Sequence, residues 1–96
     1  MVFQLIAHAQ VKQGHEEDMR KLLVKAAGIY KKDEHTLDWF VAQNKKEPTK
    51  FTIVERYTNQ EDGLKEHTAN PFYKEFGDTV KDWMASPIDL IFNSEL

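Results

Sequence analysis

The segment KFTIVERYTNQEDGLKEHTANPFYKEF, residues Lys50–Phe76, carries the strongest structural signals in this chain. In its first part, Phe51–Tyr57, β-branched and aromatic residues alternate with a period of two, which is typical of a β-strand. Glu55 falls on the otherwise apolar face of this strand. The segment therefore begins with a predicted strand that carries one carboxylate on its apolar side.

Two helix signals follow that strand. Asn59 is a preferred N-cap residue, and the acidic residue three positions later resembles a capping box. Asn70 is a second N-cap candidate, and Pro71 suits the first position of a new helix. We therefore expect a helix broken in two, with His67 just before the break.

The remaining elements are predicted by periodicity. An amphipathic stripe at helical spacing indicates a helix, and Gly28 within it is expected to mark close packing against the sheet. The predicted elements are strands at Val2–Val11, Thr36–Asn44 and 88–93, a helix at His15–Lys32, and a last helix that runs past Trp83 to Ser86-Pro87.

This order, β-α-β-β-α-β with the second helix broken, is typical of an α+β, ferredoxin-like fold. Such a fold has one antiparallel sheet with its helices on one side. The 96 residues suffice for a single domain, residues 1–96.

Apolar residues occur on both faces of the predicted strands. Trp39 and Phe40 are neighbours, as are Leu5 and Ile6, and neighbours in a strand point to opposite faces. Helices on one side can cover only one of these faces. We therefore expect the other face to bind a second copy, which predicts a homodimer.

Composition excludes several classes of protein. The net charge is −3, and no basic face is apparent that would indicate nucleic-acid binding. The chain has no cysteine, no apolar run long enough for a membrane helix and no leader-like start, so a cytoplasmic protein is expected. Its four histidines lack metal-ligand spacing, so neither a metal nor another cofactor is expected.

Aromatic residues with a few polar groups predict an apolar site between sheet and helices. His67 is the main acid–base candidate, because imidazole titrates near neutrality. An equally good alternative is that His67 hydrogen-bonds the broken backbone. For Glu55, the second candidate, the preferred interpretation is a buried partner of Arg56, a lysine or a backbone group. The expected lining residues are Tyr30, Trp39, Phe40, Phe72, Tyr73, Phe76 and Trp83. For Phe72, Phe76 and Trp83, core packing is the preferred interpretation, because aromatic stripes at helical spacing are more often core than pocket.

The segments FTIVERY, residues 51–57, and EHTANPFYKEF, residues 66–76, resemble the antibiotic biosynthesis monooxygenase domain, in particular its quinol-oxidising and autoinducer-degrading members. The resemblance implies a dimeric α+β barrel without metal or flavin. It also implies catalytic roles for His67 and Tyr73. The haem-degrading members use other residues at the positions of Ala7, His67 and Gly77, so haem degradation is not expected.

Three functions follow from these observations. The first is a cofactor-independent monooxygenase that deprotonates a small phenolic, quinol or polyketide-like compound for reaction with O2. The second is an acid–base isomerase acting on a small carbonyl compound. The third is a non-catalytic, dimeric, stress-associated binding domain, since a fold alone does not establish function.

Overall fold

The computed structural model describes all residues 1–96. It confirms the predicted order of elements and the break in the second helix. The elements are β1 (Phe3–Gln10), α1 (Glu16–Tyr30), β2 (Thr36–Gln43), β3 (Lys50–Tyr57), α2 (Gln60–Ala69), α3 (Pro71–Val80) and β4 (Asp89–Ser94).

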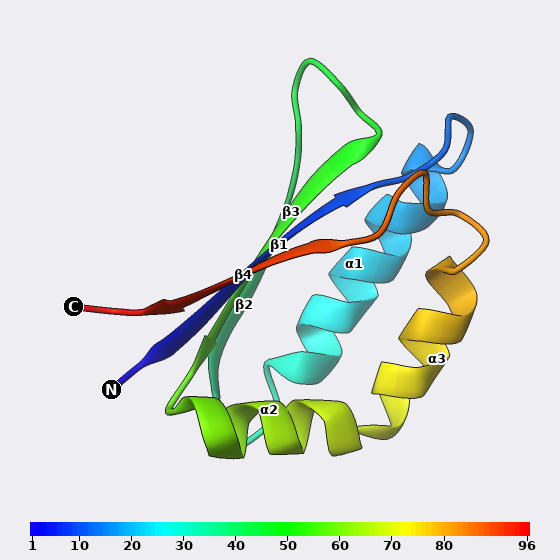
Figure 1. Cartoon of the computed structure of the whole chain (residues 1–96). Helices are drawn as coiled ribbons and strands as arrows, with labels where there is room; N and C mark the ends of the chain where they lie inside the picture. The colour runs from blue at the N-terminus through cyan, green and yellow to red at the C-terminus, as the bar shows by residue number, and fades with distance from the viewer.

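The four strands form one antiparallel sheet in the order β2-β3-β1-β4. All three helices lie on the same side of this sheet, and the two chain termini emerge close together (Figure 1). The protein therefore has the α+β, ferredoxin-like fold expected from its sequence. None of its helices has the length and apolar character needed to span a membrane.

The helix caps follow from the residues that the sequence analysis identified. The side chain of Asn59 accepts a hydrogen bond from the backbone N–H of Asp62, and that of Asn70 accepts one from Phe72. Pro71 occupies the first turn of α3, where its missing N–H costs nothing. These caps account for the break between α2 and α3.

The core lies between the sheet and α1. The predicted stripe on α1 is buried through Met19, Leu23, Ala26 and Tyr30, each at most 2% exposed. It packs against the inward residues of the central strands, which are Phe3, Leu5, Ala7 and Ala9 on β1 and Phe51, Ile53 and Tyr57 on β3.

A β-bulge changes the expected pattern on β2. The register shifts between Thr36 and Asp38, so that β2 has one extra residue relative to β3. Trp39 faces the core and is 2% exposed, whereas Leu37, expected on the same face, is 47% exposed. The bulge therefore breaks the alternation at the start of the strand.

The last helix is shorter than predicted, because α3 ends at Val80. Trp83 lies in the turn that follows, where its carbonyl accepts a hydrogen bond from the N–H of Lys12 and its ring stacks on His15 at 5.7 Å. Trp83 continues the helical spacing of apolar residues in α3, but the helix itself has already ended at Val80.

Gly28 also departs from expectation. It is exposed on α1, and a Cβ added there would meet no atom within 4 Å. It does not mark close packing against the sheet.

The face without helices carries an apolar row that crosses the whole sheet. Phe40, Val54, Ile6 and Ile91 are successive cross-strand partners on β2, β3, β1 and β4. Phe40 is 48% exposed and Ile91 is 40% exposed, so the chain alone leaves this row open to solvent.

Candidate functional site

An apolar cavity of about 430 Å³ lies between the inner face of the sheet and helices α2 and α3. It exists because α3 packs against α1 and α2 and leaves the inner side of β4 uncovered. Leu90 and Phe92 on β4 are each 53% exposed as a result. The cavity is lined by Leu5, Ala7, Tyr30, Trp39, Ile53, Glu55, Leu64, His67, Thr68, Tyr73, Phe76, Gly77, Val80, Ile88, Leu90 and Phe92.

Glu55 is the only carboxylate among these lining residues. Strand alternation turns it inward between Ile53 and Tyr57, and it is 5% exposed. The hydroxyl of Tyr57, two residues along the same face, donates a hydrogen bond to Glu55 Oε1. The indole N–H of Trp39 is also buried there, but it makes no hydrogen bond.

His67 is brought to the cavity by the anchoring of α2. The neighbouring Glu66 accepts hydrogen bonds from the backbone N–H groups of Glu34 and His35, at 3.1 and 2.7 Å. At the end of the helix, Asn70 donates to the carboxylate of Asp33 at 3.1 Å. Both ends of the turn that carries His67 are thus tied to the α1–β2 connection.

The imidazole of His67 is enclosed by aromatic rings. Its ring centroid lies 4.2 Å from that of Tyr30 and 5.3 Å from that of Tyr73. Nε2 lies 3.8 Å from Glu55 Oε1, which is close for a charge interaction but too long for a hydrogen bond. Nδ1 is buried and has no hydrogen-bond partner.

Burial shifts the pKa values of His67 and Glu55 in the directions that favour the neutral form of each side chain. Desolvation lowers the pKa of His67 to about 4, so its imidazole is neutral at pH 7. Desolvation raises the pKa of Glu55, while the Tyr57 hydroxyl and the nearby Trp39 indole oppose that rise. A pair of titratable groups whose pKa values are both shifted by burial in an apolar cavity is typical of a functional site.

Of the nine residues predicted for the site, six surround this cavity, namely Tyr30, Trp39, Glu55, His67, Tyr73 and Phe76. The other three residues do not line the cavity, and Phe72 and Trp83 instead pack in or against the core, which was the preferred interpretation for both. Phe40 lies on the opposite face of the sheet, because its neighbour Trp39 points inward. Phe72 is buried at the contact with Tyr30, and Trp83 lies against His15.

The alternative prediction, that His67 hydrogen-bonds the backbone at the break between α2 and α3, is wrong. The break between α2 and α3 is capped by the side chain of Asn70, and no ring nitrogen of His67 bonds to the backbone.

Sequence reasoning did not include Tyr57 or the β4 residues Leu90 and Phe92 in the site. Tyr57 follows Glu55 by two positions, so the strand period already placed them on one face. No sequence pattern indicated that Leu90 and Phe92 line the cavity, because their exposure on the inner face of β4 depends on how α3 packs.

The other histidines do not extend this site. His8, His15 and His35 lie elsewhere, and no group of three His, Cys, Asp or Glu side chains is placed to hold a metal ion.

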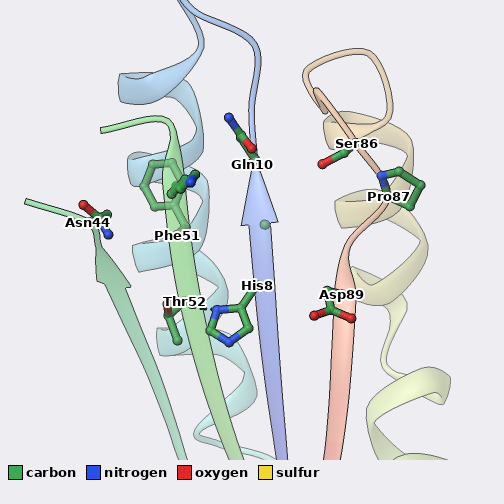
Figure 2. A pocket seen from close by; sticks show the side chains of 10 residues that line it. His8, Gln10, Asn44, Phe51, Thr52, Ser86, Pro87 and Asp89 are labelled. Carbon is green, nitrogen blue, oxygen red and sulfur yellow. Dashed lines mark hydrogen bonds between the residues drawn. The ribbon is translucent and has the colours of Figure 1, made fainter. Parts of the chain in front are cut away.

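A second hollow of similar volume lies on the helix-free face of the sheet. Figure 2 shows His8 there between Thr52 on β3 and Asp89 on β4. His8 and Asp89 are solvent-exposed. This hollow therefore lacks a buried titratable group such as Glu55, which is 5% exposed in the cavity.

Comparison with known proteins identifies the family. Residues 2–79 match the family model described as antibiotic biosynthesis monooxygenase. The chain belongs to the antibiotic biosynthesis monooxygenase family. Among curated proteins, none matches this chain.

Solved structures of family members and other bacterial and archaeal proteins share the fold. A family protein from Nitrosomonas europaea is 23% identical, with a TM-score of 0.93 over 99% of this chain and 90% of that chain. Rv0793 from Mycobacterium tuberculosis is 17% identical, with a TM-score of 0.90 over 100% and 96% of the two chains. A conserved protein from Methanosarcina mazei is 19% identical, with a TM-score of 0.90 over 100% and 94%.

Proposed function

We propose that this family member is a cofactor-independent monooxygenase that oxidises a small phenolic, quinol or polyketide-like compound in the cavity around Glu55 and His67. The observation that carries the proposal is a neutral, buried imidazole with one unpaired nitrogen beside a buried carboxylate. Such a nitrogen can accept a substrate proton without first losing a protein hydrogen bond.

The pair can work as a proton acceptor in the following way. The carboxylate of Glu55 favours a proton on the nearer nitrogen of His67, Nε2, which leaves a lone pair on Nδ1. A substrate hydroxyl or an acidic C–H then transfers its proton to Nδ1. The imidazolium that forms is stabilised by Glu55, and the substrate becomes an electron-rich anion.

The anion supplies the electrons for reaction with O2. One oxygen atom enters the product, and the other leaves as water. For a doubly activated CH2 group, CH2 and O2 become C=O and H2O, so no external reductant is needed. The protein contributes the base and a predominantly apolar lining around the substrate.

The walls of the cavity favour a flat, apolar substrate. Trp39, Tyr30, Tyr73 and Phe76 supply aromatic surface, and about 430 Å³ lies within the usual range for small-molecule sites. Tyr73 lines the cavity and is 46% exposed as a residue. Its hydroxyl can donate a hydrogen bond to a substrate oxygen that gains negative charge.

The test is oxygen uptake with a panel of quinols and anthrones, combined with product mass under ¹⁸O2. Incorporation of one labelled oxygen atom by metal-free, flavin-free protein in the presence of a chelator is expected. Product formation without O2 would instead indicate the acid–base isomerase, and binding without turnover would indicate a binding domain.

We also propose that the protein acts as a homodimer. The apolar row of Phe40, Val54, Ile6 and Ile91 crosses all four strands, and the rows on either side of it are polar except for Ala42. A second sheet face, related by two-fold symmetry, would bury this row against an identical row. The resulting pair of sheets is the α+β barrel that the family resemblance implies.

A further inference from the structure

Tyr57 contacts the acid–base pair from a position that the substrate cannot reach. It is fully buried, at 0% exposed, and is not among the residues that line the cavity. Its hydroxyl donates to Oε1 of Glu55, the same oxygen that lies 3.8 Å from Nε2 of His67. Tyr57 is therefore connected to His67 through one carboxylate oxygen.

The ring of Tyr57 has little freedom to move. On one side, α2 approaches so closely that a Cβ added at Gly63 would lie 2.5 Å from Cβ of Tyr57. On another side, the ring stacks on Phe3 at a centroid distance of 6.1 Å. Gly63 and His67 are one helical turn apart, so the contact that confines Tyr57 also places His67.

No cation faces Glu55. The groups around its carboxyl are the hydroxyl of Tyr57, the indole of Trp39, the imidazole of His67 and, at longer range, the hydroxyl of Tyr30. Burial and the neighbouring Glu55 raise the pKa of Tyr57, so its hydroxyl stays protonated and is the donor in its bond to the Glu55 carboxylate. Tyr57 thus makes the hydrogen bond that contributes most to stabilising the Glu55 carboxylate, and the indole of Trp39 contributes less.

We infer that Tyr57 is a positioning residue, which holds Glu55 ionised with Oε1 towards His67 and so keeps Nδ1 of His67 free to accept the substrate proton. This inference rests on the proposed function for its role in turnover. The structural part of the inference is that the Tyr57 hydroxyl stabilises the ionised carboxylate of Glu55, and this part can be tested without any substrate.

The first experiment is an NMR titration of the ¹³C-labelled Glu55 carboxyl in the substrate-free protein. Tyr57→Phe keeps the packed ring but removes the donor, and the titration midpoint of Glu55 should rise by about 1–2 pH units. The matched control is Tyr73→Phe, since Tyr73 contacts His67 but not Glu55. An unchanged Glu55 midpoint in Tyr57→Phe would overturn the inference.

A second measurement uses the unaltered protein and does not depend on how the variant folds. The ¹³Cζ shift of Tyr57 should change with the same pH midpoint as the Glu55 carboxyl. Independent midpoints would show that the two groups are not coupled, which contradicts the inference.

The third experiment uses the active enzyme. In Tyr57→Phe, the acid limb of the kcat profile should move to higher pH by a similar amount, with KM unchanged. An unmoved acid limb would overturn the role in turnover. If the wild-type protein oxidises none of the compounds, the proposed function fails, and the two NMR measurements still decide the contact between Tyr57 and Glu55.

Discussion

His67 is a buried imidazole whose surroundings disfavour a positive charge. Aromatic rings enclose it, and its one charged neighbour, Glu55, is itself a desolvated carboxyl with a raised pKa. The result is a base that is neutral at physiological pH and lacks a partner at Nδ1. At the residue scale, this combination distinguishes His67 from the exposed His8.

His67→Gln should lower turnover by roughly 10²–10⁴-fold, the usual contribution of a positioned proton-transfer group. Glutamine fills most of the same space, so the melting temperature should fall by only a few degrees. The control is His8→Gln on the opposite face of the sheet, which should leave turnover unchanged. Wild-type turnover in His67→Gln would remove His67 from the mechanism.

The depressed pKa of His67 also predicts a pH dependence of stability. The unfolded chain binds this proton below about pH 6.5, whereas the folded protein binds it only near pH 4. Between these values the unfolded state binds more protons, so stability is lost on acidification. The raised pKa of Glu55 acts in the opposite direction, because it makes the folded state bind more protons than the unfolded state. The contribution of His67 must therefore be measured as the difference in stability between the wild type and a His67 variant.

We therefore expect the free energy of unfolding of wild type, minus that of His67→Gln, to rise by about 3 kcal/mol from pH 4 to pH 6.5. Urea unfolding at a series of pH values measures this difference. A difference that does not vary with pH would show that the folded imidazole titrates normally.

At the element scale, two glycines in helices have opposite environments. Gly28 on α1 faces open space, while Gly63 on α2 lies against the side chain of Tyr57. Glycine is unfavourable inside a helix unless a close approach requires it. Substitution of Gly28 therefore reports on helix propensity alone, whereas substitution of Gly63 also reports on the packing of α2 against Tyr57.

Gly28→Ala should stabilise the protein by about 0.5–1 kcal/mol, because it restricts the unfolded chain without a clash. Gly63→Ala should destabilise it by about 1–3 kcal/mol, since the new methyl group would have to displace Tyr57 or α2. Thermal and urea unfolding of both variants provide the measurement. Equal effects of the two substitutions would contradict the close packing of α2 on β3.

At the scale of the whole molecule, the sheet has one covered face and one open face. The helices bury the inward side chains of β1 and β3, and nothing within the chain covers the apolar row that ends at Phe40 and Ile91. A row of this kind across four strands is typical of an association surface.

Light scattering should give about twice the 11.2 kDa mass of one chain at micromolar concentration. Phe40→Glu places a charge in the proposed interface, at one end of the apolar row, and should shift the protein to monomer. Val24→Glu is the control, because Val24 is exposed on α1, away from this face. A wild-type monomer would contradict the dimer.

Local patterns were sufficient to predict most of the fold. The period of two on β3, the caps Asn59 and Asn70, and Pro71 act within a few residues of chain, so the strand and the broken helix could be recognised directly. The position of Glu55 on an apolar strand face was predicted for the same reason. The bulge at Leu37 and the end of α3 before Trp83 were missed, because pairing with β3 and contact with His15 prevail there over local periodicity.

The site depended on packing between distant segments. Strand alternation placed Glu55 and Tyr57 on one face, but the approach of α2 brought His67 to them, and that approach depends on Gly63 and on the anchoring of Glu66. The pKa values of the pair likewise follow from burial, which is a property of the assembled layers and not of any segment. The sequence therefore predicted Glu55 and His67 as candidate acid–base groups, while their distance, protonation states and shared cavity arose only when sheet and helices packed together.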